Sequence, residues 1–498
     1  MAIGDLVAGA SVAVVLIPQS VAYAELAGVP ATAALPAAAA AALGGAVLAS
    51  SPYLQTGPTA LTSLLVLGAL GALAGTGEAA LEQAMLLALT IGVIRVVLGL
   101  ARGGAVAFFV SDPMLAGLLP AAAITIAATQ LPALLGVTEI PETGIFQRAG
   151  WALAHPASWD TTTVGLSVGA IALMVLGKRL GVGLASVPLV VVAAVVWSAL
   201  ADFGGATIGD LHAGAPTSPF GLPWGGLGGL LLPALIIAVV GFVEPTTIGR
   251  TLLERDRRWN ADRELVSQGV ANLASGFAGG FPVSGSFSRS ALNLAAGART
   301  RLSGAVSGLL VLAFIPFADV LGDLPSAIPA AIVVVAVAGL ARPRRLVRLA
   351  RSSRTQFGVA LATFVLVLVL APRIDEAVAI GIALAVGVHL WREMRVPVAV
   401  HVEGDALHLH PAGVLWFGSA ARFEDEVGEI TAAHPDCTSL VIHLDGLGRV
   451  DLTGARSLAR VLEEARRRGL EASVEGIPPT TGGMIGRVLG GESPGERR

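Results

Sequence analysis

Long apolar runs fill most of the first 396 residues, and short polar or proline-bearing stretches divide them. At about 20 residues per membrane span, the pattern predicts fourteen segments, some of them short or broken. The first seven centre on residues 6–26, 31–49, 58–73, 82–100, 108–135, 164–175 and 187–201. The second seven centre on residues 227–248, 264–277, 286–296, 302–317, 328–340, 356–370 and 376–390.

Two of these segments are interrupted in the same way. Residues 281–296, FPVSGSFSRSALNLAA, predict an extended stretch that leads into a short helix, and residues 53–65, YLQTGPTALTSLL, have the same order. A proline-broken segment precedes each: Pro18 lies 39 residues before Gly57, and Pro245 lies 40 residues before Gly285. Matched breaks of this kind indicate two structural repeats with a binding site at the bilayer midplane.

Composition and charge support a polytopic membrane protein. The 498 residues are 54% hydrophobic and 13% charged, with a mean hydropathy of +0.77, which no ordinary soluble domain needs. With a cytoplasmic N-terminus, the even-numbered loops hold sixteen basic residues, namely Arg102, Lys178, Arg179, Arg250, Arg255, Arg257, Arg258, Arg263, Arg299, Arg301, Arg342, Arg344, Arg345, Arg348, Arg351 and Arg354. The odd-numbered loops hold only Arg148 and Arg373. This asymmetry follows the positive-inside rule and predicts a bacterial inner-membrane protein.

The pattern changes after Trp391. Residues 397–498 carry 15 acidic and 10 basic side chains, and they predict a soluble domain of about 100 residues. Strands are expected at 398–402, 406–410, 439–444 and 470–474, with an amphipathic helix at 452–468. We therefore divide the chain into a membrane domain, 1–396, and a cytoplasmic α/β domain, 397–498.

Three stretches resemble one family. IPQSVAYAELAG at 17–28, GPTALTSLL at 57–65 and PVSGSFSRSALNLAAGARTRLSG at 282–304 are similar to the sulfate permease family of anion transporters, which in animals is the solute carrier 26 family. DGLGRVDLTG at 445–454 resembles the central motif of the STAS domain, named for sulfate transporters and anti-sigma-factor antagonists. The resemblance implies two inverted seven-helix repeats that form a core and a gate domain. It also implies a homodimer, and an anion held between the third and tenth segments.

The tenth segment supplies the first candidate site residues. Ser286, Phe287, Ser288 and Arg289 match the family's binding segment, and we expect backbone N–H groups and hydroxyls as donors with Arg289 as the compensating charge. The alternative for Arg289 is an interfacial side chain that reaches the headgroups.

The opposing donors are expected from Thr59, Ala60 and Leu61. Gln19 follows the first proline break, where a role in the binding cavity and a role in packing or capping are equally consistent with the sequence.

Two carboxylates, Glu25 and Glu244, lie within apolar segments and are candidates for proton coupling, because a buried intramembrane carboxylate is costly and by default functional. Glu25 is near a segment end and has an interfacial alternative. Glu244 has an alternative as a structural partner of Arg289. For that reason Glu25 is preferred as the proton carrier.

The expected function is secondary active transport of a small anion (sulfate, bicarbonate or a dicarboxylate) by proton symport. The alternatives are a sodium-coupled bicarbonate carrier and an anion sensor that signals through the STAS domain. We expect no enzyme activity, cofactor, metal site or nucleic-acid partner. Thr453 is interpreted as a helix cap, and His401, His408 and His410 as scattered surface residues.

Overall fold

The computed structural model describes residues 3–71, 77–181, 183–211, 219–252, 259–341, 343–477 and 482–489. The chain forms two compact units, Met1–Ala383 and Leu384–Arg498. Arg255, Arg257, Arg258 and Arg342, which contribute to the charge argument, lie outside the described residues, as does the end of the segment predicted at 58–73.

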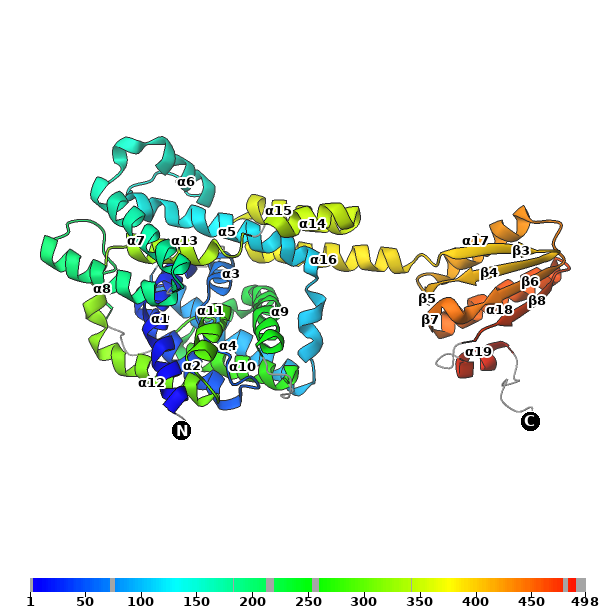
Figure 1. Cartoon of the computed structure of the whole chain (residues 1–498), viewed down its shortest axis with the longest axis horizontal. Coiled ribbons are helices and arrows are strands. Elements are labelled where there is room, and N and C mark those ends of the chain that lie inside the picture. The colour runs from blue at the N-terminus through cyan, green and yellow to red at the C-terminus, as the bar shows by residue number, and fades with distance from the viewer. Residues whose placement is uncertain are drawn as a thin grey trace. The chain divides into compact units, whose positions relative to one another are not determined.

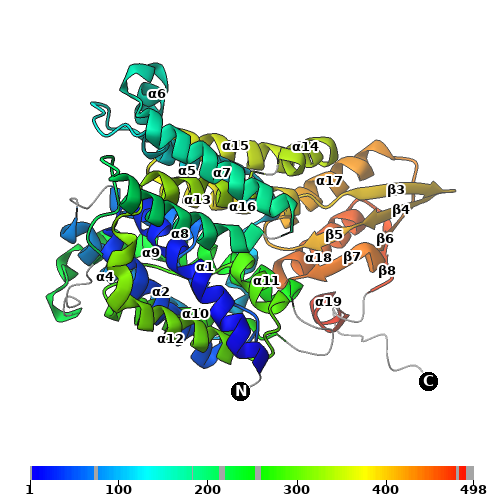
Figure 2. The same ribbon diagram turned by 60° about the vertical axis from the view of Figure 1, so that its left-hand side comes forward.

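Every predicted membrane segment coincides with a helix, and all of these helices lie in the first unit except the last, α16, which crosses the boundary between the two units (Figures 1 and 2). The first seven are α1 (Ile3–Ala27), α2 (Ala34–Leu48), α3 (Ala60–Gly71), α4 (Glu78–Leu100), α5 (Asp112–Leu135), α7 (Thr161–Arg179) and α8 (Gly183–Ala201). The second seven are α9 (Leu227–Thr251), α10 (Ala261–Phe277), α11 (Phe287–Ala295), α12 (Leu302–Phe314), α13 (Ala327–Val337), α15 (Arg354–Leu370) and α16 (Ile374–Glu393). Within the described ranges, eight helical spans are long and apolar enough to cross a membrane, and four further apolar helices are shorter.

Two further helices, α6 (Ile145–Ala154) and α14 (Pro343–Ser352), stand where only loops were expected. Each has 10 residues, too short to be found by a search for spans. The arginines of α14 alternate with Leu346, Val347 and Leu349, so that one face is basic and the other apolar. Such a helix is suited to the membrane interface.

Two short strands lie at the centre of the membrane unit. β1 (Thr56–Gly57) leads into α3 and β2 (Ser284–Gly285) leads into α11. They pair antiparallel, with Thr56 opposite Gly285 and Gly57 opposite Ser284. The two predicted extended stretches therefore meet each other directly, although nothing in the sequence predicted that they would pair.

The second unit is a small α/β domain. Strands β3 (Val398–Glu403), β4 (Ala406–Pro411), β6 (Ser439–His443) and β8 (Glu471–Glu475) form one sheet in that order. Helices α17 (Ala420–Ala433) and α18 (Leu452–Arg467) share a core with it that includes Leu409, Phe423 and Leu458. The short strands β5 (Gly413–Leu415) and β7 (Leu447–Val450) form a separate parallel pair, and α19 (Gly482–Leu489) follows β8.

One detail of this unit corrects the sequence interpretation. The side chain of Asp451, not that of Thr453, caps α18 by accepting a hydrogen bond from the Gly454 N–H at 2.7 Å. A cap residue must precede the first helical turn, and Thr453 already lies within that turn.

Candidate functional site

The β1–β2 pair brings the first turns of α3 and α11 together. The first backbone bond of α3 runs from Ser63 N–H to Thr59 O, and the first of α11 runs from Ser290 N–H to Ser286 O. The N–H groups before these bonds have no partner within their own helix, and the positive ends of both helix dipoles lie there. Two such ends inside a membrane protein form an environment suited to an anion.

Arg289 connects the two half-helices. Its side chain is 1% exposed; Nη1 donates to Gln19 Oε1 at 3.2 Å and Nη2 to Pro58 O at 2.8 Å. Its Nε has no hydrogen-bond partner among the described residues, and the same holds for Thr59 Oγ1 and Ser63 Oγ on α3. Buried polar groups are usually hydrogen-bonded, so these three atoms are candidate donors to a ligand at this site.

The side chain of Glu244, on α9, lies at the first turn of α11. Its Oε1 accepts a hydrogen bond from the Phe287 N–H at 3.0 Å. The ion pair with Arg289 that the sequence suggested is not among the salt bridges of the described residues, and the polar partners of Arg289 come from α1 and the start of α3. Glu244 therefore acts as a carboxylate cap at the position where an incoming anion would find the same N–H group.

Pro245 lies within α9, which runs without interruption from Leu227 to Thr251, so the segment predicted to be broken there, like the one at Pro18 in α1, is a continuous helix. Pro245 has no N–H, so Gly241 O loses its helical donor. The Ser284 hydroxyl donates to that oxygen at 2.5 Å. The start of β2 is thereby tied to α9 near Pro245, and the side chain of the preceding residue, Glu244, lies beside α11.

A polar face of α10 supports both strands. Asn272 receives the Val283 N–H and donates to Val283 O, each at 3.0 Å, while Gln268 donates to Thr56 Oγ1 at 2.8 Å. Glu264 accepts the N–H groups of Ser50 and Ser51 at 2.9 and 3.2 Å. These side chains recur every four residues and are fully buried, so α10 serves as a rigid base for the site. The sequence reasoning missed this role, which a polar stripe at helical spacing could have indicated.

Arg95 on α4 is a second fully buried arginine that was missed. It donates to the carbonyls of Ala238 (Nε, 3.1 Å), Val283 (Nη1, 3.2 Å) and Ile237 (Nη2, 3.1 Å). All three of its nitrogens are used within the protein, so Arg95 is a structural cation. An arginine in the middle of an apolar span was the available signal.

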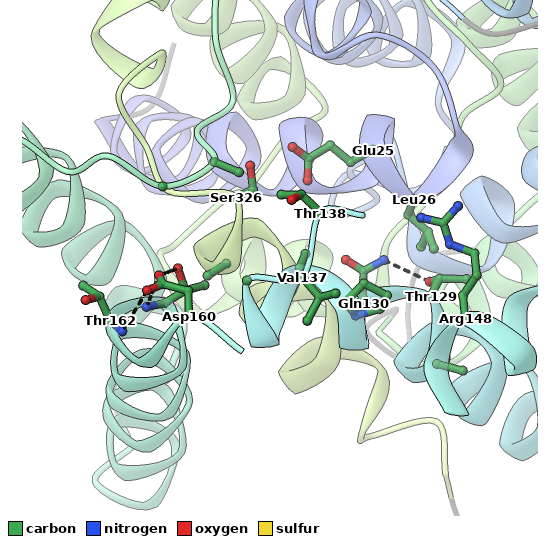
Figure 3. Close-up of a pocket in the computed structure, with 18 of the residues that line it drawn as sticks. Glu25, Leu26, Thr129, Gln130, Val137, Thr138, Arg148, Asp160, Thr162 and Ser326 are labelled. Carbon is green, nitrogen blue, oxygen red and sulfur yellow. Dashed lines mark hydrogen bonds between the residues drawn. The ribbon is translucent and has the colours of Figure 1, made fainter. Parts of the chain in front are cut away.

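Glu25 lies elsewhere, in the wall of a cavity of about 1220 Å³ (Figure 3). Residues from the ends of α1, α3 and α5 line this cavity, together with residues of α6, α7, α8 and α13. The lining also includes Arg148 on α6, and Asp160 and Ser326, which directly precede α7 and α13. None of the residues around Arg289 is part of the lining. Glu25 lies six positions after Gln19 on α1, which corresponds to a rise of about 9 Å along the helix axis. The cavity is therefore distinct from the site at the half-helices.

The first turn of α11 is partly exposed. Phe287 is 44% exposed, Ser288 is exposed and Glu244 is partly exposed, whereas Gln19, Thr59 and Arg289 are buried. The structure thus brings together Gln19, Thr59, Ser286, Phe287, Arg289 and Glu244, with Ala60 and Leu61 in the first turn of α3 and Ser288 in that of α11. Of the predicted site residues, only Glu25 is set apart.

The chain combines a helical membrane unit, in which the strands before two half-helices pair, with a small α/β unit, and paired half-helices of this kind are typical of a membrane carrier. The family model described as the sulfate permease family matches residues 3–363, and the STAS domain model matches residues 397–485. The chain belongs to the sulfate permease family. It is a multi-pass membrane transporter of anions, and the family is one of transporters rather than enzymes.

Individual relatives agree with this assignment. The chain is 30% identical to the chloroplastic sulfate transporter 4.1 of Arabidopsis thaliana over 510 residues, 94% of this chain and 74% of the relative. It is also 30% identical to a probable sulfate transporter of Mycobacterium tuberculosis, with coverage of 94% and 88%.

Two solved structures share the fold. Murine solute carrier 26 family member A9 in the inward-facing state matches with a TM-score of 0.87 at 21% identity, covering 98% of this chain and 87% of that one. The transmembrane domain of a cyanobacterial bicarbonate transporter matches with a TM-score of 0.63 at 22% identity, covering 77% and 97%.

Proposed function

We propose that the protein is a secondary active transporter that binds a small anion between the first turns of α3 and α11 and carries it with a proton. The observation that carries this proposal is the pairing of β1 with β2, which juxtaposes two helix N-termini and a buried arginine whose Nε has no partner among the described residues. The anion receives N–H groups from both helices and a charge-assisted bond from Arg289.

Charge balance suggests how the proton enters. Each helix N-terminus is equivalent to about half a positive charge, so that two of them and Arg289 supply about +2. An ionised Glu244 reduces this to about +1, which suits a monovalent anion. A protonated Glu244 restores about +2, which suits a divalent anion such as sulfate.

The hydrogen bond of Glu244 also favours binding of the anion after Glu244 is protonated. Its carboxylate accepts from the Phe287 N–H, so an ionised Glu244 competes with the substrate for a donor. Protonation weakens that acceptor and releases the N–H for the anion. This geometry supports Glu244 ahead of Glu25 as the coupling residue, which reverses the preference drawn from the sequence.

We propose that the core domain moves against the gate domain during the transport cycle. The residues around Arg289 are reached past Phe287 and Ser288, while the cavity at Glu25 lies on another side. If the N-terminus is cytoplasmic, the route past Phe287 and Ser288 leads to the cytoplasm, and the cavity at Glu25 faces the opposite side of the membrane. We propose a homodimer in the bacterial inner membrane, with the STAS domain of residues 397–498 in the cytoplasm.

Uptake into proteoliposomes tests this function. Labelled sulfate, bicarbonate and a dicarboxylate are offered under an inward proton gradient, an inward sodium gradient and no gradient. We expect accumulation of a divalent anion driven by the proton gradient. Accumulation of bicarbonate driven only by sodium would support the sodium-coupled alternative, and anion binding without flux would support a sensor.

A further inference from the structure

The sheet of the second unit gathers half of the chain's histidines on one face. The sequence has eight histidines, and His401, His408, His410 and His443 all point away from the core that contains Leu407, Leu409, Leu440 and Ile442. Strand pairing creates the group: His401 is opposite His408, and the parallel register that joins Leu409 to Ile442 places His410 beside His443. His401, His408 and His410 are at least partly exposed, as expected from the sequence, but they are not scattered, because the strand register gathers them on one face.

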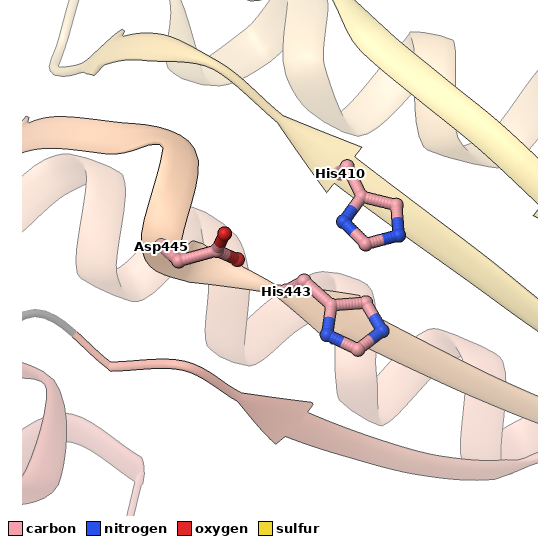
Figure 4. A group of neighbouring side chains, drawn as sticks. All are labelled: His410, His443 and Asp445. Carbon is pink, nitrogen blue, oxygen red and sulfur yellow. The ribbon is translucent and has the colours of Figure 1, made fainter.

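Three side chains of this face form a compact group (Figure 4). A ring nitrogen of His410, a ring nitrogen of His443 and a carboxylate oxygen of Asp445 all lie within 4.8 Å of one another. The rings of His410 and His443 are stacked, with centroids 4.2 Å apart and planes 6° apart. Asp445 follows directly in the 3-10 turn Leu444–Gly446. We propose that His410, His443 and Asp445 form a binding site for a divalent transition-metal ion, with Zn²⁺ as the expected occupant.

The ligand chemistry fits this ion. Imidazole nitrogens suit zinc, copper and nickel, whereas magnesium and calcium prefer oxygen. Ligand atoms around a tetrahedral zinc ion lie about 3.3 Å apart, from metal–ligand distances of about 2.0 Å. The three atoms, which lie within 4.8 Å of one another, must therefore approach by at most about 1.5 Å. His410 and Asp445 are exposed and His443 is half-buried, so side-chain rotation supplies this movement without a change in the sheet.

Neighbouring groups supply the outer contacts that such sites use. His443 Nδ1 lies 3.7 Å from Glu475 Oε2, and His443 Nε2 lies 3.0 Å from His408 Nδ1. A metal-bound histidine commonly donates its second N–H to a carboxylate, which fixes the ring orientation. Glu475 is placed for that role when His443 Nε2 binds the metal. His408 is then the nearest side chain for a fourth coordination position.

The test is a metal titration of the full-length protein, purified in detergent with a tag that contains no histidine. Calorimetry at about pH 7.5, above the range in which imidazole is protonated, is expected to show one Zn²⁺ bound per chain and no heat from Mg²⁺. With Cu²⁺ as a spectroscopic probe, the paramagnetic resonance spectrum is expected to show coupling to two imidazole nitrogens.

The variants His443→Asn and Asp445→Asn are expected to weaken Zn²⁺ binding by about tenfold or more. His401→Asn is the matched control, because His401 is exposed on the same face but lies outside the group of three, and its affinity should equal that of the wild type. Absence of Zn²⁺ binding by the wild type would overturn the proposal. Equal binding by all three variants would also overturn it, because the ion would then lie elsewhere.

Discussion

Replacement of Arg289 by glutamine isolates the charge that we assign to the substrate. Arg289 uses Nη1 and Nη2 within the protein and leaves Nε without a partner among the described residues, so the anion gains one charge-assisted hydrogen bond from it. Such a bond contributes about 1.5–3 kcal/mol, which corresponds to a factor of about 10 to about 150 in Kd. Arg289→Gln should therefore weaken anion binding by about that factor, measured by calorimetry on the purified transporter.

Arg95→Gln is the matched control for this experiment. Arg95 is equally buried, but all three of its nitrogens bond to carbonyls, so its replacement should lower the thermal unfolding temperature and leave the Kd of the folded protein unchanged. Arg289→Gln also removes donors from Gln19 and Pro58, at a cost of about 1–3 kcal/mol in stability. An unchanged Kd for folded Arg289→Gln would refute the assignment of Arg289 to the anion.

Three further predictions concern coupling, architecture and domain roles. Glu244→Gln should abolish uptake driven by a pH gradient but preserve exchange of internal for external anion. Glu25→Gln should retain both activities. Undiminished pH-driven accumulation in Glu244→Gln would reject Glu244 as the coupling residue. Ser284→Ala leaves Gly241 O without its hydroxyl donor and should destabilise the protein by about 1–3 kcal/mol, measured by thermal unfolding. An unchanged unfolding temperature would show that the Gly241 carbonyl needs no such bond. Removal of residues 397–498 should leave anion affinity unaltered, since every proposed ligand precedes Pro397; weaker binding by a well-folded truncation would assign part of the site to the STAS domain.

The helices of the membrane unit could be predicted from the sequence because length and apolarity determine a span locally. Proline alone was a poor signal, because α1 and α9 continue through Pro18 and Pro245. Gly57, Pro58 and Pro282 nevertheless mark non-helical backbone, so the starts of the half-helices could be predicted. The β1–β2 pairing could not, since Thr56 and Gly285 are far apart in the chain and nothing local identifies the partner of a two-residue strand.

The roles of the side chains that support the site could not be predicted without knowledge of their partners. Glu264 and Asn272 were visible as polar residues in a predicted span, but their roles depend on which backbone groups lie opposite them. The proposal that Glu244 rather than Glu25 takes up the proton needed the structure for the same reason, because it rests on the acceptor contact of Glu244 with the Phe287 N–H. The histidine face needed a strand register, which alternation within one strand does not provide.

Protection of an introduced thiol tests the central claim most directly, that the anion binds at the first turn of α11. Cys437 is the chain's single cysteine, so Cys437→Ser provides a cysteine-free background for Ser288→Cys and, separately, for Thr138→Cys in the cavity of Glu25. Both Ser288 and Thr138 are exposed, so a thiol-specific reagent should reach either position. We predict that the transported anion slows labelling of Ser288→Cys and leaves labelling of Thr138→Cys unchanged. Protection of Thr138→Cys alone would place the anion in the cavity and contradict the site at the half-helices.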